Sequence, residues 1–356
     1  MTFLHPVRWH AIVAPCLVAM VALLTAPRVR AADDSWSAPP AVPGGRIVFQ
    51  VATASNEDPI AAGKAAGESL KTQMAGIPLR AVFVSESFED RENKEKLLEG
   101  LAAVLPKAIL LGEATYGSFT RSGCSDADSV CLLGIGGDGI SVSAALVTDL
   151  GTSKLTFETH RDEIEKRLHS AGHTLAGKLR RTPQDRLAIL LADAHSPKNQ
   201  PLVEGVQEVA GKQFPITGGC ANKNAGQTFV YFHGKPYADS AVAVMLSGDF
   251  HLAMAGRQAK DNEKVISTAR ESAVAALAGI RGKPVAAVAF NCAGRKGKLK
   301  NIEDELAAIQ QAIGKELPLF GCYCAGEMGP VDTVDKKPDA LSGGAGWHIM
   351  FTVIGR

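Results

Sequence analysis

Apolar and polar positions follow one order three times along the chain. In each segment a short apolar run precedes a polar loop, then apolar residues recur at helical spacing, and a second apolar run ends in a glycine turn. The first runs of these segments are AVFVSES (81–87), LAILLADAHS (187–196) and VAAVAFNCAG (285–294). This order predicts a β-α-β unit in each segment.

The central stretch of each segment has the spacing of an amphipathic helix. Apolar side chains recur at intervals of three and four, for example at Leu98, Leu101 and Leu105, or at Leu306, Ile309 and Ile313. A proline follows each stretch, at Pro106, Pro215 and Pro318, and we expect the helix to end near it. Each segment is also preceded by a further helical stretch and followed by strand-like sequence.

The glycine turns support a repeated architecture, because Gly112, Gly218 and Gly321 occupy matching positions. A second glycine follows at matched spacing in the first and third turns, whereas Lys223 stands there in the second. We therefore predict an α/β fold of three related units with mixed sheets. These units are expected to form a larger N-terminal domain (46–255) and a smaller C-terminal domain (256–356).

The N-terminus has the pattern of an export leader. Residues 1–31 combine a weakly basic start with an apolar stretch that is shorter than a membrane span, and Val29 and Ala31 are small residues at the usual recognition positions. We expect cleavage after Ala31 and a periplasmic or secreted protein, with an uncleaved membrane anchor as the alternative. Residues 32–45 are rich in proline and predict an exposed linker.

Composition narrows the function classes. The chain of 356 residues has 46% apolar residues and a formal net charge of +1, which disfavours nucleic-acid binding. Seven cysteines, one of them in the leader, are too few for a disulfide-framed scaffold. Two disulfides remain open, one from Cys220 to Cys322 or Cys324 and one between Cys124 and Cys131.

Turns that follow strands commonly bind small molecules in α/β proteins, because glycine lets a ligand approach the backbone amides. If the three units pack around a common centre, residues of the three turns line one cleft. The predicted ligand-binding residues are Gly112, Glu113, Tyr116, Gly218, Gly219, Cys220, Asn222, Gly321, Cys322, Tyr323, Cys324, Gly326 and Glu327. Glu327 either accepts a hydrogen bond from a ligand amine or caps backbone amides.

Other chemistry is less well supported by the residue pattern. No CxxC pair accompanies Cys322 and Cys324, so a buried or disulfide role is favoured over a metal site. No histidine lies in a recognised catalytic context, so no catalytic residue is assigned. No CxxCH motif is present, so a haem would bind non-covalently through an axial ligand such as histidine. The segments 134–141 and 294–300 are interpreted as a tight hairpin turn and an exposed basic loop.

The stretch LPLFGCYCAGEMGP (317–330) resembles the C-terminal signature of the FIST sensory family, with its Gly-Glu-aliphatic-Gly-Pro ending. VFVSES, AILLGEATYG, LAILLADAHS and FPITGGCANKN resemble the family's N-terminal domain. The resemblance spans about Ile47 to Val353, and the domains 46–255 and 256–356 correspond to its FIST N and FIST C parts. The chain differs at Glu113, where relatives often carry cysteine.

The resemblance implies a small-ligand sensor, with amino acids or related metabolites among the candidate ligands and no cofactor. A haem-binding gas sensor and a thiol-dependent enzyme using Cys322 or Cys324 are the alternatives. Many relatives are joined to signalling output domains, and no such segment is recognised here. Such a protein either passes its signal to a separate signalling protein or simply binds its ligand. We expect no nucleic acid as partner, and membrane contact only through an uncleaved leader.

Overall fold

One arrangement of strands and helices occurs three times in the computed structural model, between Val48 and Gly355. The structure describes residues 1–2, 34–224 and 226–356, so the predicted leader and its cleavage site lie outside the described residues, except for residues 1 and 2. Residues 34–356 form one compact unit. Each repeat has the order β-α-β-α-β, then a short β-hairpin, then a closing strand.

The bounds of the elements are as follows. Strand β1 (Ser35–Ser37) precedes the repeats. The first repeat comprises β2 (Val48–Ser55), α1 (Pro59–Met74), β3 (Leu79–Glu86), α2 (Arg91–Ala102), the short 3-10 helix η1 (Lys107–Ile109), β4 (Leu110–Ala114), β5 (Ser118–Thr120), β6 (Gly123–Ser125) and β7 (Ser129–Gly136). The second comprises β8 (Ile140–Val147), α3 (Phe157–Lys178), β9 (Asp185–Ala192), α4 (Asn199–Ala210), β10 (Ile216–Cys220), β11 (Val230–Phe232), β12 (Lys235–Tyr237) and β13 (Ala241–Gly248). The third comprises β14 (His251–Gln258), α5 (Asn262–Gly279), β15 (Pro284–Cys292), α6 (Ala293–Lys296), α7 (Ile302–Ile313), β16 (Leu319–Cys324), β17 (Glu327–Gly329), β18 (Gly343–Ala345) and β19 (His348–Gly355).

Within the described residues the strands form three mixed sheets, each built around four strands of one repeat. The sheet orders are β1-β8-β13-β9-β10-β17-β18, β12-β11-β4-β3-β7-β2 and β14-β19-β15-β16-β5-β6. In every sheet one pair is parallel, namely β3 with β4, β9 with β10, and β15 with β16. The predicted α/β fold of three related units with mixed sheets is therefore confirmed.

The short hairpins are exchanged between repeats. The hairpin of the first repeat (β5 and β6) joins β16 of the third, that of the second (β11 and β12) joins β4 of the first, and that of the third (β17 and β18) joins β10 of the second. Each repeat thus donates a hairpin to one neighbour and receives one from the other. This exchange closes the three repeats into a ring.

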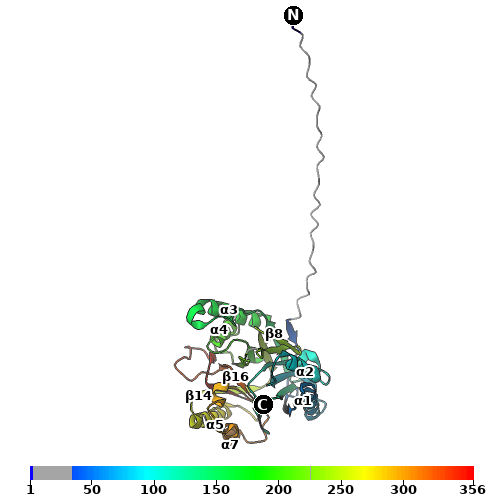
Figure 1. Cartoon of the computed structure of the whole chain (residues 1–356). Coiled ribbons are helices and arrows are strands. Elements are labelled where there is room, and N and C mark those ends of the chain that lie inside the picture. The colour runs from blue at the N-terminus through cyan, green and yellow to red at the C-terminus, as the bar shows by residue number, and fades with distance from the viewer. Residues whose placement is uncertain (3–33, 225) are drawn as a thin grey trace. The chain divides into compact units, whose positions relative to one another are not determined.

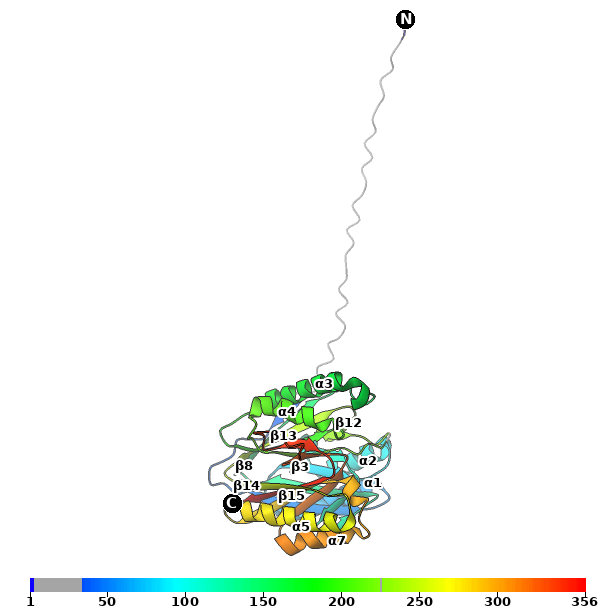
Figure 2. The same ribbon diagram turned by 90° about the vertical axis from the view of Figure 1, so that its left-hand side faces the viewer.

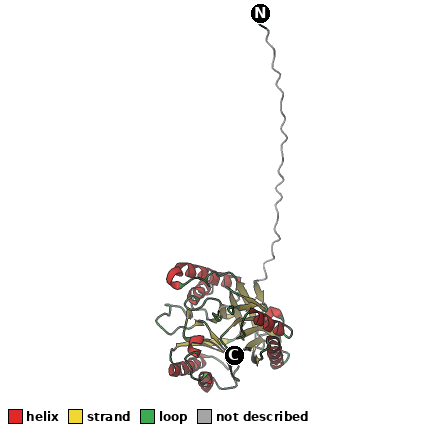
Figure 3. Ribbon diagram, viewed as in Figure 1, coloured by secondary structure: helices red, strands yellow, loops and turns green. Residues whose placement is uncertain are grey.

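The helices lie outside the sheets in three groups (Figures 1 and 3). Helices α3 and α4 pack together, as do α1 with α2 and α5 with α7, and Figure 2 shows the last pair below β15. The inner faces of the sheets meet in one apolar core, to which Phe83, Ile189 and Phe290 contribute from the first, second and third repeats. None of the described helices is both long enough and apolar enough to pass through a bilayer.

Short polar side chains begin several of the helices. Asp58, Asp90 and Asp261 each accept a hydrogen bond from a backbone N–H in the first turn of α1, α2 and α5. Helices α4 and α7 end at Gly211 and Gly314, whose φ angles are positive. The predicted prolines lie several residues later, directly before β10 and β16, so they mark the entry to the strand and not the end of the helix.

Three local expectations are wrong. Residues 134–141 do not form a hairpin, because β7 and β8 belong to different sheets and the connection between them carries the chain from one repeat to the next. The described part of the segment 32–45, which starts at residue 34, is not simply an exposed linker, since β1 pairs with β8 and Ala38 is buried. In the segment 294–300, Arg295 is fully buried in α6.

Candidate functional site

The three glycine turns meet at one place in the ring. Their backbones are hydrogen-bonded in cyclic order, so that each turn is bonded to the other two. The bonds run from Tyr116 N–H to Tyr323 O (2.8 Å), from Ala325 N–H to Cys220 O (2.9 Å) and from Asn222 N–H to Ala114 O (2.8 Å). The predicted common centre is therefore present as a ring of backbone hydrogen bonds.

Glycine is needed in these turns because other backbone lies against them. A Cβ at Gly112 would lie 2.1 Å from the carbonyl oxygen of Val84, and one at Gly218 would lie 1.9 Å from that of Leu190. Both contacts are with the parallel neighbouring strand, and no real side chain tolerates them. The matching glycines thus serve strand packing at the centre.

Most of the predicted site residues are sealed inside this centre. Glu113, Cys220, Asn222, Cys322, Tyr323, Cys324 and Glu327 are each at most 2% exposed. Their polar atoms are partly used by the protein: Tyr323 donates from its hydroxyl to Glu305 Oε2 (3.2 Å), and Glu327 Oε2 accepts from the N–H of His348 (3.1 Å). Tyr116 is more exposed, and its hydroxyl accepts from the N–H of Lys223 (3.0 Å).

One cavity opens next to these turns. It has a volume of about 390 Å³ and we call it the Tyr116 cavity; among its lining residues are Tyr116, Lys223, Cys292, Cys324, Gly326 and Trp347. Of the predicted site residues, Tyr116, Cys324 and Gly326 line it. Glu327 lies behind the wall, where burial raises its pKa well above the ordinary value although the backbone N–H of His348 counteracts this.

A second cavity lies at the carboxyl ends of β9 and β10 and was not predicted. It has a volume of about 430 Å³ and we call it the Asp193 cavity; its polar lining includes Asp193, His195, Lys198, Lys223, Thr228 and Asp239. Lys223 lines both cavities. The one hint in the sequence is that Asp193 and His195 follow directly after a buried strand, where α/β proteins tend to place functional groups.

The Asp193 cavity carries two carboxylates and two ammonium groups. Burial raises the pKa of Asp193 to about 6, although the N–H of Asp239 donates to its Oδ2 (3.1 Å). Burial, together with Lys223 and Lys198, lowers the pKa of His195 to about 4, so this imidazole is neutral at pH 7. Burial also lowers the pKa of Lys198.

One carboxylate oxygen of Asp239 is an unsatisfied hydrogen-bond acceptor in the same cavity. Its Oδ2 accepts a hydrogen bond from the N–H of Gly151 (2.8 Å), whereas its buried Oδ1 has no partner among the described residues. A buried acceptor without a partner costs free energy, which a bound donor would recover. The cavity therefore presents unmet polar groups as well as charge of both signs.

The described cysteines are all free thiols. The two disulfides considered from the sequence are absent. Cys124 lies in the hairpin β5–β6, whereas Cys131 lies in the core strand β7. The thiol of Cys220 donates a hydrogen bond to the carbonyl oxygen of Ala194 (3.2 Å). Cys322 and Cys324 approach to 3.6 Å between their sulfur atoms. Burial raises the pKa of both thiols, which is the wrong direction for a thiolate nucleophile.

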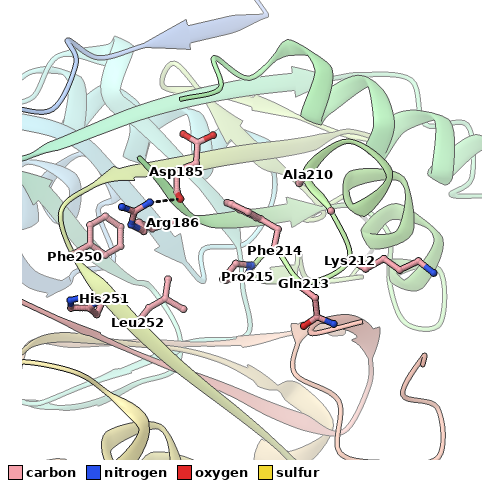
Figure 4. A pocket seen from close by; sticks show the side chains of 11 residues that line it. Asp185, Arg186, Ala210, Lys212, Gln213, Phe214, Pro215, Phe250, His251 and Leu252 are labelled. Atoms are coloured by element: carbon pink, nitrogen blue, oxygen red, sulfur yellow. Dashed lines mark hydrogen bonds between the residues drawn. The ribbon is translucent and has the colours of Figure 1, made fainter. Parts of the chain in front are cut away.

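A larger hollow lies away from the glycine turns (Figure 4). Its volume is about 610 Å³, and it is lined by residues at the opposite ends of the strands, including Arg186, Phe214, Pro215, Phe250 and Leu252. Its buried carboxylate, Asp185, already accepts from Arg181 Nε (2.7 Å) and from the Ser247 hydroxyl (2.7 Å). Because the carboxylate of Asp185 already has partners within the protein, we interpret this hollow as a surface depression and not as a ligand site.

Comparison with solved structures gives distant likenesses. A cyanuric acid hydrolase from A. caulinodans has 11% identity and a TM-score of 0.44, covering 87% of this chain and 100% of that one. A second cyanuric acid hydrolase has 12% identity and a TM-score of 0.45, covering 87% and 99%. PurLQS from Thermotoga maritima has 10% identity and a TM-score of 0.28, covering 87% and 72%. No curated protein matches the sequence.

Comparison with protein families is decisive. The FIST N domain matches residues 78–279, and the FIST C domain matches residues 237–330. The first match alone covers more than half of the chain, and both agree with the resemblance noted from the turn sequences. FIST domains are sensory domains, which suggests small-ligand binding in signal transduction. The chain belongs to the FIST family.

Proposed function

We propose that this protein is an exported, non-catalytic sensor that binds an amino acid or a related zwitterionic metabolite. The observation that carries the proposal is the charge pattern of the Asp193 cavity, where Lys198 and Lys223 stand near Asp193 and Asp239. A zwitterion satisfies both signs at once: its carboxylate pairs with the lysines, and its ammonium donates to the free Oδ1 of Asp239. The volume of about 430 Å³ lies in the range of ordinary small-molecule sites.

The Tyr116 cavity completes the proposed site. It adjoins the Asp193 cavity through Lys223 and adds the aromatic side chains of Tyr116 and Trp347, which provide apolar surface for a ligand side chain. Glu327 and Cys322 lie behind its wall and support it from inside, whereas Cys324 is part of its lining. Ligand binding at the meeting point of the repeats is well placed to change how they pack, which a separate signalling protein then detects.

A binding screen tests the proposal. The full chain is tested against the standard amino acids by thermal shift, and hits are measured by calorimetry. We expect a saturable rise in melting temperature that is lost in Lys223→Met and weakened in Asp239→Asn. Lys212→Met, which removes an exposed lysine from the hollow of Figure 4, serves as control and should bind as the wild type does.

Two outcomes would count against this proposal. A ligand whose affinity is the same in Lys223→Met, Asp239→Asn and the wild type binds elsewhere. A Soret band in the purified protein would instead support the haem alternative. For the thiol-dependent enzyme, the deciding result is rapid alkylation of Cys322 or Cys324 in the native protein; both are at most 1% exposed, and we expect slow alkylation.

Export is proposed from the leader. N-terminal sequencing of the protein recovered from the periplasm or medium should begin at Ala32. Recovery of the intact N-terminus in the membrane fraction would support an uncleaved anchor instead.

A further inference from the structure

We propose that Glu113, Cys322 and Cys324 form a binding site for a zinc ion at the point where the three repeats meet. Glu113 comes from β4 of the first repeat, and both cysteines come from β16 of the third. The inference stands apart from the proposed ligand binding and does not depend on it.

The donor atoms have nearly the spacing that zinc requires. The two sulfur atoms are 3.6 Å apart, and the sulfur of Cys324 is 3.5 Å from Oε1 of Glu113. All three donor atoms lie within 4.8 Å of one another. Bonds of about 2.3 Å to sulfur and about 2.0–2.2 Å to oxygen in a tetrahedral site put neighbouring donors roughly 3.5–3.8 Å apart. Two of the three edges therefore fit without movement, and the third, which is at most 4.8 Å, must shorten by up to about 1 Å.

The donor set is buried, and one of its polar atoms has no partner among the described residues. Each of the three side chains is at most 2% exposed. The thiol of Cys324 donates to Oε1 of Glu113, and the buried Oε2 has no hydrogen-bond partner among the described residues. A buried carboxyl group with an unused oxygen is costly unless a cation or donor satisfies it. A metal ion would meet that need and hold both sulfurs as thiolates.

The second repeat carries no side chain at the position that adjoins these donors. Gly219 is the residue of the second repeat that corresponds to Glu113 and Cys322, because each follows the matching glycine of its turn. A Cβ at Gly219 would lie 2.4 Å from the sulfur of Cys324 and 2.7 Å from Oε1 of Glu113. Any side chain there would push the donors apart.

The donor chemistry favours zinc over the other common ions. Two thiolates and one carboxylate suit zinc, whereas magnesium and calcium prefer oxygen donors alone. A disulfide between Cys322 and Cys324 would join residues two apart on one strand, which would strain the bridge, and it would leave Glu113 unexplained. Cys324 also lines the Tyr116 cavity, so an ion that enters this cavity reaches one of its ligands.

Cobalt substitution tests the site with an optical readout. The full chain is reduced, freed of metal with a chelator, and titrated with Co²⁺, both on the native protein and during refolding. We expect a thiolate-to-cobalt charge-transfer band and the visible bands of tetrahedral cobalt, saturating at one ion per chain and removed by Zn²⁺. Absence of the thiolate band under both conditions would overturn the proposal.

Variants assign the ligands. Cys322→Ser and Cys324→Ser should each lose the band or weaken binding at least tenfold, whereas Cys124→Ser, on the hairpin β5–β6, should keep it. Should the serine variants not fold, Glu113→Gln decides, because it should bind Co²⁺ at least tenfold more weakly and lose the rise in melting temperature that Zn²⁺ gives the wild type. Wild-type affinity in Glu113→Gln, or loss of the band in a folded Cys124→Ser, contradicts the assignment.

Discussion

Lys94 lies 2.9 Å from Oε1 of Glu86, and the side chains of both residues are fully buried. Glu86 ends β3 and Lys94 lies in α2, so the pair joins a strand to the helix that follows it. The hydroxyl of Tyr231, on the hairpin donated by the second repeat, also donates to Oε1 of Glu86. One buried carboxylate therefore links the fold of the first repeat to the hairpin exchange.

Removing the cation from this pair should be strongly destabilising. In Lys94→Met the carboxylate of Glu86 stays buried without its ion-pair partner, which costs about 3–5 kcal/mol in the free energy of unfolding. Urea unfolding measures the change. Lys96→Met is the matched control, because Lys96 lies in the same helix and pairs with Glu92 at the surface, 2.7 Å away, so its loss should leave stability near wild type. Equal effects of the two variants would show that the buried pair has no special role.

Two helical glycines in the second repeat should respond to alanine with opposite signs. A Cβ at Gly205 in α4 would lie 2.0 Å from the carbonyl oxygen of His169 in α3, so Gly205→Ala should force the two helices apart and cost about 1–3 kcal/mol. Gly177, in the last turn of α3, has open space around its Cβ position, so Gly177→Ala should stabilise by about 0.5–1 kcal/mol. Thermal unfolding of both variants gives the comparison, and destabilisation by both would contradict the expected contrast.

The Asp193 cavity should make stability depend on pH through two opposed groups. The pKa of Asp193 is raised to about 6, so its contribution to stability is present near pH 4 and lost as the pH rises through 6. The pKa of His195 is lowered to about 4, so its contribution is present above about pH 6.5 and lost as the pH falls toward 4. The shifts correspond to at most about 3 kcal/mol for Asp193 and about 3.5 kcal/mol for His195.

Variants separate these opposed contributions, which interact because His195 Nε2 lies 3.3 Å from Asp193 Oδ1. Asp193→Asn keeps the histidine alone, so its stability should rise from pH 4 to pH 6.5 more steeply than that of the wild type. His195→Gln keeps the aspartate alone and should lose stability over the same range, relative to the wild type. Urea unfolding at several pH values from 4 to 7 measures this, and three parallel profiles would refute the assigned shifts.

Sequence patterns anticipate the repeated fold and the meeting of the turns because both depend on local features. Periodic apolar positions predict the strands and helices of each repeat. The matched spacing of Gly112 and Gly218 marks the turns, and the structure shows that both residues are glycine because a neighbouring strand lies against them. The exchange of hairpins depends on which distant strand edges fit together, and short apolar runs carry no information about that. The pairing of β11 with β4 is an example.

The same limit explains the site residues that the patterns miss. The Asp193 cavity combines a strand end, a loop that carries Lys223 and the turn that carries Asp239, and these come together only in the folded chain. The buried state of Arg295 was missed because the neighbouring lysines and glycines make the segment look exposed. Burial of a charge depends on distant partners, here Glu305 and Val265, which a local pattern does not show.

The buried guanidinium of Arg295 donates hydrogen bonds in several directions, and the last prediction concerns its replacement. It donates to Asn291 Oδ1, Glu305 Oε1 and the carbonyl oxygen of Val265, each at 2.9 Å, and to the hydroxyl of Thr268 at 3.1 Å. Lysine keeps the charge but cannot supply a planar set of donors. Arg295→Lys should therefore leave buried acceptors unsatisfied and cost about 2–4 kcal/mol in the free energy of unfolding.

The conservative change isolates geometry from charge. Arg270→Lys, at an exposed position of α5, is the control and should change stability by less than about 0.5 kcal/mol. Wild-type stability in Arg295→Lys would mean that a buried point charge is sufficient for this network. A large loss confined to Arg295→Lys would show that the strand β15, the helix α5 and the helix α7 are held together by the directed bonds of one side chain.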